Sequence, residues 1–150
     1  PFHSSHHSIT PTALLGGGAS PKPGEISLAH RGVLFLDELP EFRRNIIDLM
    51  RQPVETGEIV IERSGSRAQF PCKFMLVAAG NPCKCGYYGD AETACRCTPG
   101  EVSRYQNRIS RPFLDRIDIR IAIGRVTGAE LRTAPATSSA QIAACTKTKP

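Results

Sequence analysis

The sequence has no run of 18 apolar residues, so no segment of it is expected to span a membrane. Its first residues, Pro1 to His7, lack the charged start and the apolar core of a secretory signal. The chain also has no initiator Met and stops at Pro150 without a clear ending. We therefore interpret it as an interior piece of a longer protein, and we expect that protein in the cytoplasm.

Charge and cysteine use narrow the class of protein further. The net charge is +5, and Arg supplies 14 of the 19 basic residues. Such an excess is compatible with nucleic acid, but a solvated basic surface explains it equally well. The preference for Arg over Lys favours bidentate contacts with phosphate. There are six cysteines, and without an export signal they favour a metal site or free thiols over disulfides.

The order of apolar segments predicts an α/β fold with a parallel sheet. Residues 33–36 and 74–79 are continuous apolar runs, which are typical of strands buried on both faces. Residues 117–123 alternate apolar and polar, as a third strand does. A helix from about Phe42, ended by Pro53, and a hairpin over 58–70 lie between the first two strands. Strands separated by helices indicate an α/β sheet.

The remaining segments are expected to be less regular. Residues 1–24 are rich in His, Ser, Pro and Gly and are interpreted as a loop. We interpret its histidines as loop residues rather than metal ligands. Residues 80–100 are expected to form an irregular insert. Short helices are predicted over 25–30, 101–109 and 112–115.

Two carboxylates directly follow the first predicted strand. Asp37 and Glu38 come after four apolar residues, which is the Walker B pattern of nucleotide triphosphatases. Ligands of such sheets lie beyond the carboxyl ends of the strands. There, Asp37 can hold Mg²⁺, which neutralises phosphate charge, and Glu38 can orient or deprotonate the attacking water. The alternative is that both acids only favour the start of a helix near Pro40.

Two further polar signals follow in the order that such a site requires. Asn81 follows the second strand, where an amide can sense the γ-phosphate; alternatively it is a turn residue before a proline. Arg111 and Arg116 precede the third predicted strand, where an arginine can reach a neighbouring subunit's γ-phosphate. The alternative for Arg116 is a surface salt bridge with Asp115 or Asp118.

Several segments together carry a family resemblance. They are Pro1–Ile9, Gly16–Gly18, Pro23–His30, Gly32–Phe42, Asn81–Asp90 and Leu114–Asp118. They resemble the magnesium-chelatase-like AAA+ ATPases, and within them the ComM/YifB branch, which is linked to DNA processing in natural transformation. The resemblance covers about residues 1–126, a partial AAA+ core. Residues 127–150 match nothing and are left unassigned, as the start of a linker or lid region.

The resemblance implies an ATP-driven hexameric ring in which each ATP site lies between subunits. Asp37 and Glu38 match the pair that coordinates Mg²⁺ and activates water. Asn81 matches the residue called sensor 1. Arg116 matches the arginine finger, and Arg111 is the second candidate for that role.

The resemblance also implies a DNA contact and a missing part. The hairpin at 58–70 matches an insertion that points into the pore, where Arg63 and Arg67 would contact DNA phosphates; alternatively both are solvated turn residues. The sequence contains no G-x-x-x-x-G-K-[ST] loop for the phosphates. In the family that loop lies upstream, and a further sensor arginine lies downstream. We therefore expect the full-length protein to be the ATPase and this chain alone to be inactive.

Four of the cysteines form a cluster of metal-ligand type. Cys83 and Cys85 are followed, nine residues later, by Cys95 and Cys97. Four thiolates suit a closed tetrahedral Zn²⁺ site, and a loop with few apolar residues needs such a staple. The alternatives are reduced thiols without a metal, or a redox disulfide.

The sequence therefore leaves three functions open. The leading one is an AAA+ ATPase that couples ATP hydrolysis to the remodelling of DNA, by branch migration or strand separation. The second is a magnesium-chelatase-type motor subunit that serves metal insertion into a porphyrin. The third is a zinc-stabilised binding module without catalysis. The cofactors expected for the first are ATP, Mg²⁺ and a structural Zn²⁺, and its partners are other copies of itself and DNA.

Overall fold

The computed structural model of the chain describes residues 1–18, 20–63 and 66–124. Its contacts divide the chain into two units, Pro1–Arg120 and Ile121–Pro150, and every described helix and strand lies in the first. None of the described helices is long and apolar enough to cross a membrane. The described elements combine helices with a parallel sheet, which confirms the predicted α/β class.

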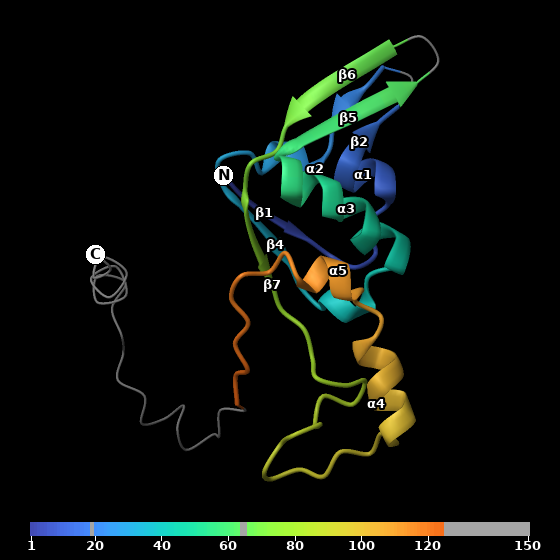
Figure 1. Cartoon of the computed structure of the whole chain (residues 1–150), viewed down its shortest axis with the longest axis vertical. Helices are drawn as coiled ribbons and strands as arrows, with labels where there is room; N and C mark the ends of the chain where they lie inside the picture. The colour runs from blue at the N-terminus through green and yellow to red at the C-terminus, as the bar shows by residue number, and fades with distance from the viewer. Residues whose placement is uncertain (19, 64–65, 125–150) are drawn as a thin grey trace, which may run out of the picture. The chain divides into compact units, whose positions relative to one another are not determined.

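A three-stranded parallel sheet lies at the centre of the first unit (Figure 1). Its strands are β1 (Phe2–Ser5), β4 (Val33–Leu36) and β7 (Met75–Ala78), in the spatial order β1-β4-β7. Both pairings are parallel, with Ser5 opposite Leu36 and Leu36 opposite Ala78. The carboxyl ends of all three strands therefore meet at one edge of the sheet.

One face of this sheet packs against helices and forms the core. Leu34 and Leu36 of β4 point to this face and are fully buried. They join apolar residues of α2 (Glu25–Leu28) and α3 (Arg44–Thr56). The buried cluster consists of Leu14, Ile26, Ala29, Leu34, Leu36, Leu39, Phe42, Ile46, Ile47, Met50, Ile59, Cys72 and Phe113.

The opposite face of the sheet is largely open in the described residues. Phe2 and Met75 are 68% and 65% exposed, and Val77 is also exposed. The rings of Phe2 and Phe35 stack on this face at 6.3 Å between centroids. The expectation that 74–79 is buried on both faces was therefore wrong. The reason is that β7 pairs only with β4 among the described strands and has helices on one side only.

The expectation of a loop over residues 1–24 was also wrong. This segment contains β1, α1 (Pro11–Leu15), β2 (Gly16–Gly17) and β3 (Lys22–Pro23). Pairing with β4 imposes the β1 conformation on a polar sequence, because tertiary contacts override weak strand propensity. The side chain of Thr10 caps α1 by accepting the N–H of Ala13 at 3.2 Å.

The long helix α3 continues past the proline that was expected to end it. Pro53 lies inside α3 and is buried. A proline in the last turn removes one hydrogen bond and is tolerated there, while its ring packs into the core. Gly57 ends the helix instead: its φ of 71° is left-handed, and its N–H donates to the carbonyl of Pro53 at 2.9 Å.

The predicted hairpin is confirmed. Strands β5 (Glu58–Arg63) and β6 (Ser66–Pro71) pair antiparallel, with Glu58 opposite Pro71 and Arg63 opposite Ser66. Figure 1 shows the pair as a separate arm beside the helices. Residues 64–65 at its tip lie outside the described residues.

The last described elements agree with the sequence only in part. Short helices occur near the predicted places, as α2, α4 (Pro99–Gln106) and α5 (Arg111–Leu114). The short helix η1 (Leu39–Glu41) was not predicted. The third strand predicted over 117–123 was wrong: residues 117–124 form no strand, and Ile119, Ile121 and Ile123 are exposed. A strand requires a neighbour for its backbone groups, and this segment has none among the described residues. The predicted tail over 127–150 lies outside them.

Candidate functional site

Asp37 and Glu38 lie at the carboxyl end of β4, as the sequence predicted. The adjoining backbone is tied to β7, because the N–H of Ala79 donates to Leu36 and the N–H of Leu39 donates to Ala79. The Asp37 side chain is exposed and accepts the N–H of Glu38 at 2.9 Å. An exposed carboxylate at the end of a parallel strand fits the oxygen ligands that Mg²⁺ prefers.

Glu38 has an unusual backbone conformation. Its φ of 53° and ψ of 45° place it in the left-handed region, where few residues other than glycine occur. This conformation turns the chain directly from β4 into η1. Such outliers persist where the surrounding structure holds them, and they concentrate at functional sites. The backbone of Glu38 therefore gives independent support for a functional role at this position.

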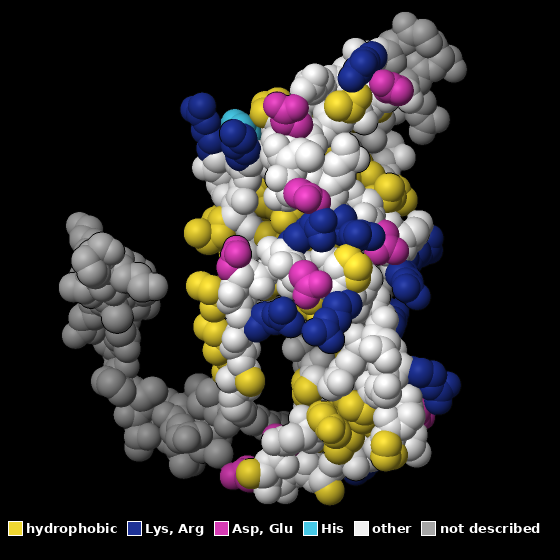
Figure 2. All heavy atoms as spheres, in the orientation of Figure 1, with side chains coloured by type: hydrophobic (Ala, Val, Ile, Leu, Met, Phe, Trp, Pro, Cys, Tyr) yellow, Lys and Arg dark blue, Asp and Glu magenta, His cyan; other side chains and the backbone are white. Residues whose placement is uncertain are grey.

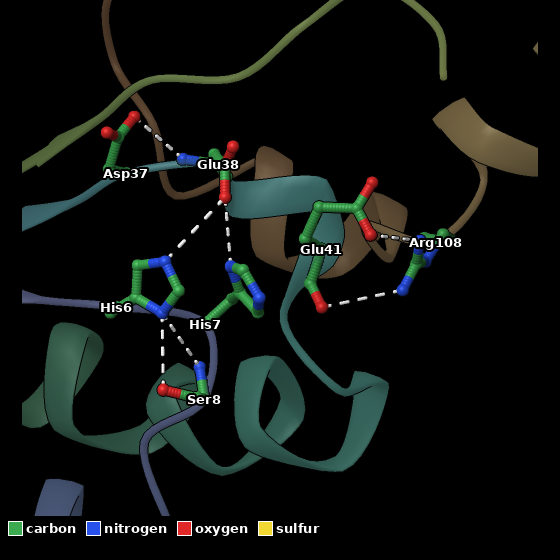
Figure 3. A network of polar contacts seen from close by, with 7 residues as sticks. All are labelled: His6, His7, Ser8, Asp37, Glu38, Glu41 and Arg108. Atoms are coloured by element: carbon green, nitrogen blue, oxygen red, sulfur yellow. Dashed lines mark hydrogen bonds and ion pairs between the residues drawn. The ribbon is translucent and has the colours of Figure 1, made fainter. Parts of the chain in front are cut away.

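Two histidines contact the Glu38 carboxylate (Figure 3). Nδ1 of His7 lies 2.9 Å from Oε2 of Glu38, and Nε2 of His6 lies 3.9 Å from the same oxygen. Nδ1 of His7 is buried and has no aligned hydrogen-bond partner among the described residues. The 2.9 Å approach is therefore an electrostatic contact rather than an aligned hydrogen bond. His6 and His7 lie in the turn after β1, as expected of loop residues, but their contact with Glu38 was not predicted.

No local sequence pattern indicated this contact, which follows from the pairing of β1 with β4. Because β1 pairs in parallel with β4, the residues that follow both strands meet at the same sheet edge. The segment that holds His6 was read as loop, so the existence of β1 was missed. Without that strand the two histidines had no assigned position.

Asn81 comes to the same edge from β7. Its neighbour Gly80 packs so closely on Pro40 that a Cβ there would lie 2.7 Å from the proline Cδ. Asn81 itself is exposed and has no polar partner among the described residues. The two histidines, the two carboxylates and this amide thus all follow the carboxyl ends of the three strands, at the same edge of the sheet. Their catalytic roles stay predictions.

An ion pair that the sequence did not indicate joins the turn after α4 to this edge. Arg108 Nη1 donates to Glu41 Oε2 at 2.9 Å, and Nη2 donates to the Glu41 carbonyl at 3.4 Å (Figure 3). Burial, together with the Glu41 carboxylate, raises the pKa of Tyr105 to about 12. Glu41 ends the short helix that begins directly after Glu38. The position of α4 is therefore coupled to the segment that carries the carboxylates.

Arg116, the first candidate for the arginine finger, does not face the carboxylates of its own chain. Arg116 donates to Glu55, with Nε at 3.2 Å from Oε2, and this hydrogen bond and the charge of Arg116 lower the pKa of Glu55. Neither Asp115 nor Asp118 is its partner among the described contacts. Glu55 lies in the last turn of α3, roughly 15 Å along the helix axis from the end near η1.

The surface around these arginines carries charges of both signs. Figure 2 shows Lys and Arg side chains interleaved with Asp and Glu side chains over α3 and α5. Arg111 is exposed and has no polar partner among the described residues. Both arginines are thus placed on a surface that a second molecule can approach.

The hairpin arginines are described only in part. Arg67 Nε lies 3.4 Å from Glu62 Oε1 across the hairpin, and both side chains are largely exposed. The side chain of Arg63 lies outside the described residues. The DNA contact expected for both stays a prediction.

The four clustered cysteines converge. Their Sγ atoms all lie within 4.8 Å of one another, and none of these cysteines forms a disulfide. Hydrogen bonds from the backbone of Tyr87 and Arg96 lower the pKa of the Cys85 thiol to about 6. Because the sulfurs come from two C-x-C pairs separated by nine residues, the cluster closes the loop that contains it.

The fold and the site together define the class of protein. A parallel sheet with a carboxylate pair at the end of its central strand is part of the core of an AAA+ ATPase. In agreement, the structure of NtrX from Brucella abortus in complex with ADP superimposes with a TM-score of 0.53 and 17% identity, over 79% of this chain and 24% of that one. At this identity the likeness concerns the fold alone.

The chain belongs to the family described as Magnesium chelatase, subunit ChlI, which matches residues 1–131. It is 55% identical over 123 residues to Competence protein ComM of Haemophilus influenzae, covering 82% of this chain and 24% of that protein. It is 54% identical, with the same coverage, to Uncharacterized protein YifB of Escherichia coli. These relatives confirm the ComM/YifB branch. The chain spans about a quarter of the length of the curated relatives that it matches.

Proposed function

We propose that the protein containing this chain is an AAA+ ATPase that couples the hydrolysis of ATP to ADP and phosphate to the remodelling of DNA. The observation that carries the proposal is the meeting of Asp37, Glu38 and the end of β7 at one sheet edge. The family membership supports the ATPase part. The 55% identity with a competence protein supports the DNA part.

Each residue at the edge has a defined task in this proposal. Asp37 binds the hydrated Mg²⁺ of MgATP through its exposed carboxylate. The bound metal neutralises phosphate charge during hydrolysis. Glu38 takes a proton from the attacking water, which requires its carboxylate to turn from His7 toward the nucleotide. Asn81 holds that water or the γ-phosphate by its amide.

The arginines complete the site between subunits. Arg116 binds Glu55 at the end of α3 that lies away from the carboxylates of its own chain, so it would serve a neighbouring copy, with Arg111 as the second candidate. This arrangement requires a closed ring, which we propose to be a hexamer.

The reduced thiols of the cysteine cluster fit the cytoplasm, where we expect the protein to act. A Zn²⁺ on that cluster is the third proposed cofactor, beside ATP and Mg²⁺.

DNA binding is tested at the hairpin. We expect Arg67→Ala in the full-length protein to weaken binding to branched DNA and to reduce the slope of log K against log salt by about 1, because one phosphate contact is lost. The matched control is Arg44→Ala, another exposed arginine paired with an acid, on α3. Equal behaviour of both variants and wild type would exclude the hairpin contact.

DNA binding and ATP turnover, measured together on the full-length protein, separate the alternative functions. ATP turnover that is indifferent to DNA, in a protein that does not bind DNA, would favour a chelatase-type motor, which the family description keeps open. Absence of turnover under every condition would favour the binding module.

A further inference from the structure

The segment that follows β7 lacks the usual means of holding a fixed conformation. Residues 80–98 form no helix or strand, and Cys83 is the one buried residue among them. Figure 1 shows this segment as a long loop that extends from the sheet to α4. Long structureless loops in compact domains need a source of order other than secondary structure. The four thiols are the feature of this loop that can supply it.

The spacing of the sulfurs fits a metal centre. Sγ of Cys83 lies 3.4 Å from that of Cys85 and 3.7 Å from that of Cys95, and Cys85 and Cys95 are 3.5 Å apart. Sulfurs of a disulfide are about 2.05 Å apart. Four sulfurs around a tetrahedral Zn²⁺ with bonds of about 2.3 Å are about 3.8 Å apart. The observed distances therefore fit tetrahedral thiolates far better than disulfides.

Backbone hydrogen bonds reach two of the four sulfurs. The backbone of Tyr87 and Arg96 hydrogen-bonds to Cys85, and the backbone of Tyr88 hydrogen-bonds to Cys83. Such second contacts orient metal ligands. A zinc ion with four thiolates carries two net negative charges, and each C-x-C pair has a cation, Lys84 or Arg96, at its centre.

We propose that Cys83, Cys85, Cys95 and Cys97 form a closed tetrahedral Zn²⁺ site that fixes Asn81 at the edge of the sheet. The zinc site stands on the sulfur geometry alone. Its effect on Asn81 also rests on the ATPase function proposed above. In this role the cysteines are positioning residues, since they act through Asn81 and touch no nucleotide.

Short covalent and hydrogen-bonded paths connect the cluster to the edge. Cys83 is two residues from Asn81, and Gln106 of α4 donates to the carbonyl of the intervening Pro82 at 3.1 Å. On the other side, Thr98 directly follows Cys97 and caps α4 through a reciprocal pair with Glu101. The helix α4 in turn reaches Glu41 through Arg108. Loss of the metal would release both connections at once.

The metal site is tested by elemental analysis of the full-length protein purified under reducing conditions. We expect one zinc per chain in the wild type and in Cys72→Ser, which removes a buried thiol outside the cluster. Cys95→Ser should retain less than about a tenth of this zinc. If Cys95→Ser does not fold, Co²⁺-substituted wild type should still show the thiolate charge-transfer bands and intense visible bands of tetrahedral CoS₄. Metal-free folded wild type, or full zinc in Cys95→Ser, would overturn the site.

The positioning role is tested by kinetics of the same protein. Removal of zinc should lower kcat for ATP on the order of 10- to 100-fold with little change in KM, because a catalytic group is misplaced. Asn81→Ala should do the same with its zinc intact, and zinc removal from that variant should cost little more. An unchanged kcat after zinc removal would overturn the positioning role. A wild type with zinc but no ATPase activity would overturn the proposed function and leave the metal site standing.

Discussion

At the scale of single residues, the contact between Glu38 and His7 is the least expected feature of the site. The carboxylate proposed to activate water is turned toward the two histidines (Figure 3). The Glu38 carboxylate is therefore engaged with the histidines rather than directed at the nucleotide site beside Asp37. Hydrolysis requires it to rotate away from His7. The contact between His7 and Glu38 is only partly buried, and ion pairs of this kind are worth about 0–1 kcal/mol. A restraint of this size can bias the carboxylate without locking it.

We expect His7→Ala to raise ATP turnover of the full-length protein in the absence of DNA. Release of a contact worth up to about 1 kcal/mol raises the population of free Glu38 by up to about 5-fold. His6→Ala, whose nitrogen lies 3.9 Å from Glu38, should have a smaller effect and serves as the comparison. Steady-state kinetics measures both. A fall in turnover for His7→Ala would show that the imidazole supports Glu38 instead of restraining it.

At the scale of elements, the sequence predicted what local pattern determines. The β4 strand, the hairpin and the short helices near 25–30, 101–109 and 112–115 follow from apolar runs, turn residues and Pro at helix starts. The predictions that were wrong concern segments whose conformation depends on pairing with residues distant in the sequence. β1 exists because β4 lies beside it, and residues 117–123 form no strand because no described neighbour pairs with them.

The candidate site was predictable to the same extent. Asp37 and Glu38 follow a strand that the sequence reveals, so their place was evident. Glu41 and Arg108 lie far apart in the sequence and meet only through the packing of α4. No local pattern encodes such a contact, and the same holds for the approach of His7 to Glu38.

The end of α3 offers a test at this scale. Gly57→Ala should destabilise the protein by about 1–2 kcal/mol, because alanine is strained at a φ of 71°. The added Cβ would also lie 2.7 Å from Lys73 Cγ. Gly100→Ala in α4 is the control, because nothing lies within 4 Å of its Cβ. Denaturant unfolding compares the two, and equal midpoints would show that Gly57 is not the helix stop.

At the scale of the whole molecule, the described sheet is open on one face, and its outer strands β1 and β7 pair only with β4 among the described strands. Exposed apolar side chains such as Phe2 and Met75 rarely form a contiguous patch on the surface of a complete soluble domain. This agrees with the expectation that the sheet of the full-length protein includes further elements, among them the phosphate-binding loop. The chain spans only about a quarter of its relatives' length, and the activity of a larger protein stays a proposal.

The division of the site between subunits is open to a mixing experiment. Full-length Glu38→Gln and Arg116→Ala should each be inactive alone. Mixed in one ring, they should regain activity, because about a quarter of the interfaces then join an intact Glu38 to an intact Arg116. ATP turnover of the mixture after subunit exchange is the readout. If the mixture stays as inactive as its components, the arginine does not act on a neighbouring copy.

In the proposed function, Glu38 activates water for ATP hydrolysis in a DNA-remodelling motor. Its most direct test is the ATP turnover of the full-length protein, wild type against Glu38→Gln, with and without branched DNA. Glu92→Gln makes the same charge change at an exposed position away from the sheet edge and serves as the control. We expect DNA-stimulated turnover in wild type and control, and a loss of about 100-fold or more in Glu38→Gln. Turnover that survives Glu38→Gln would contradict the account.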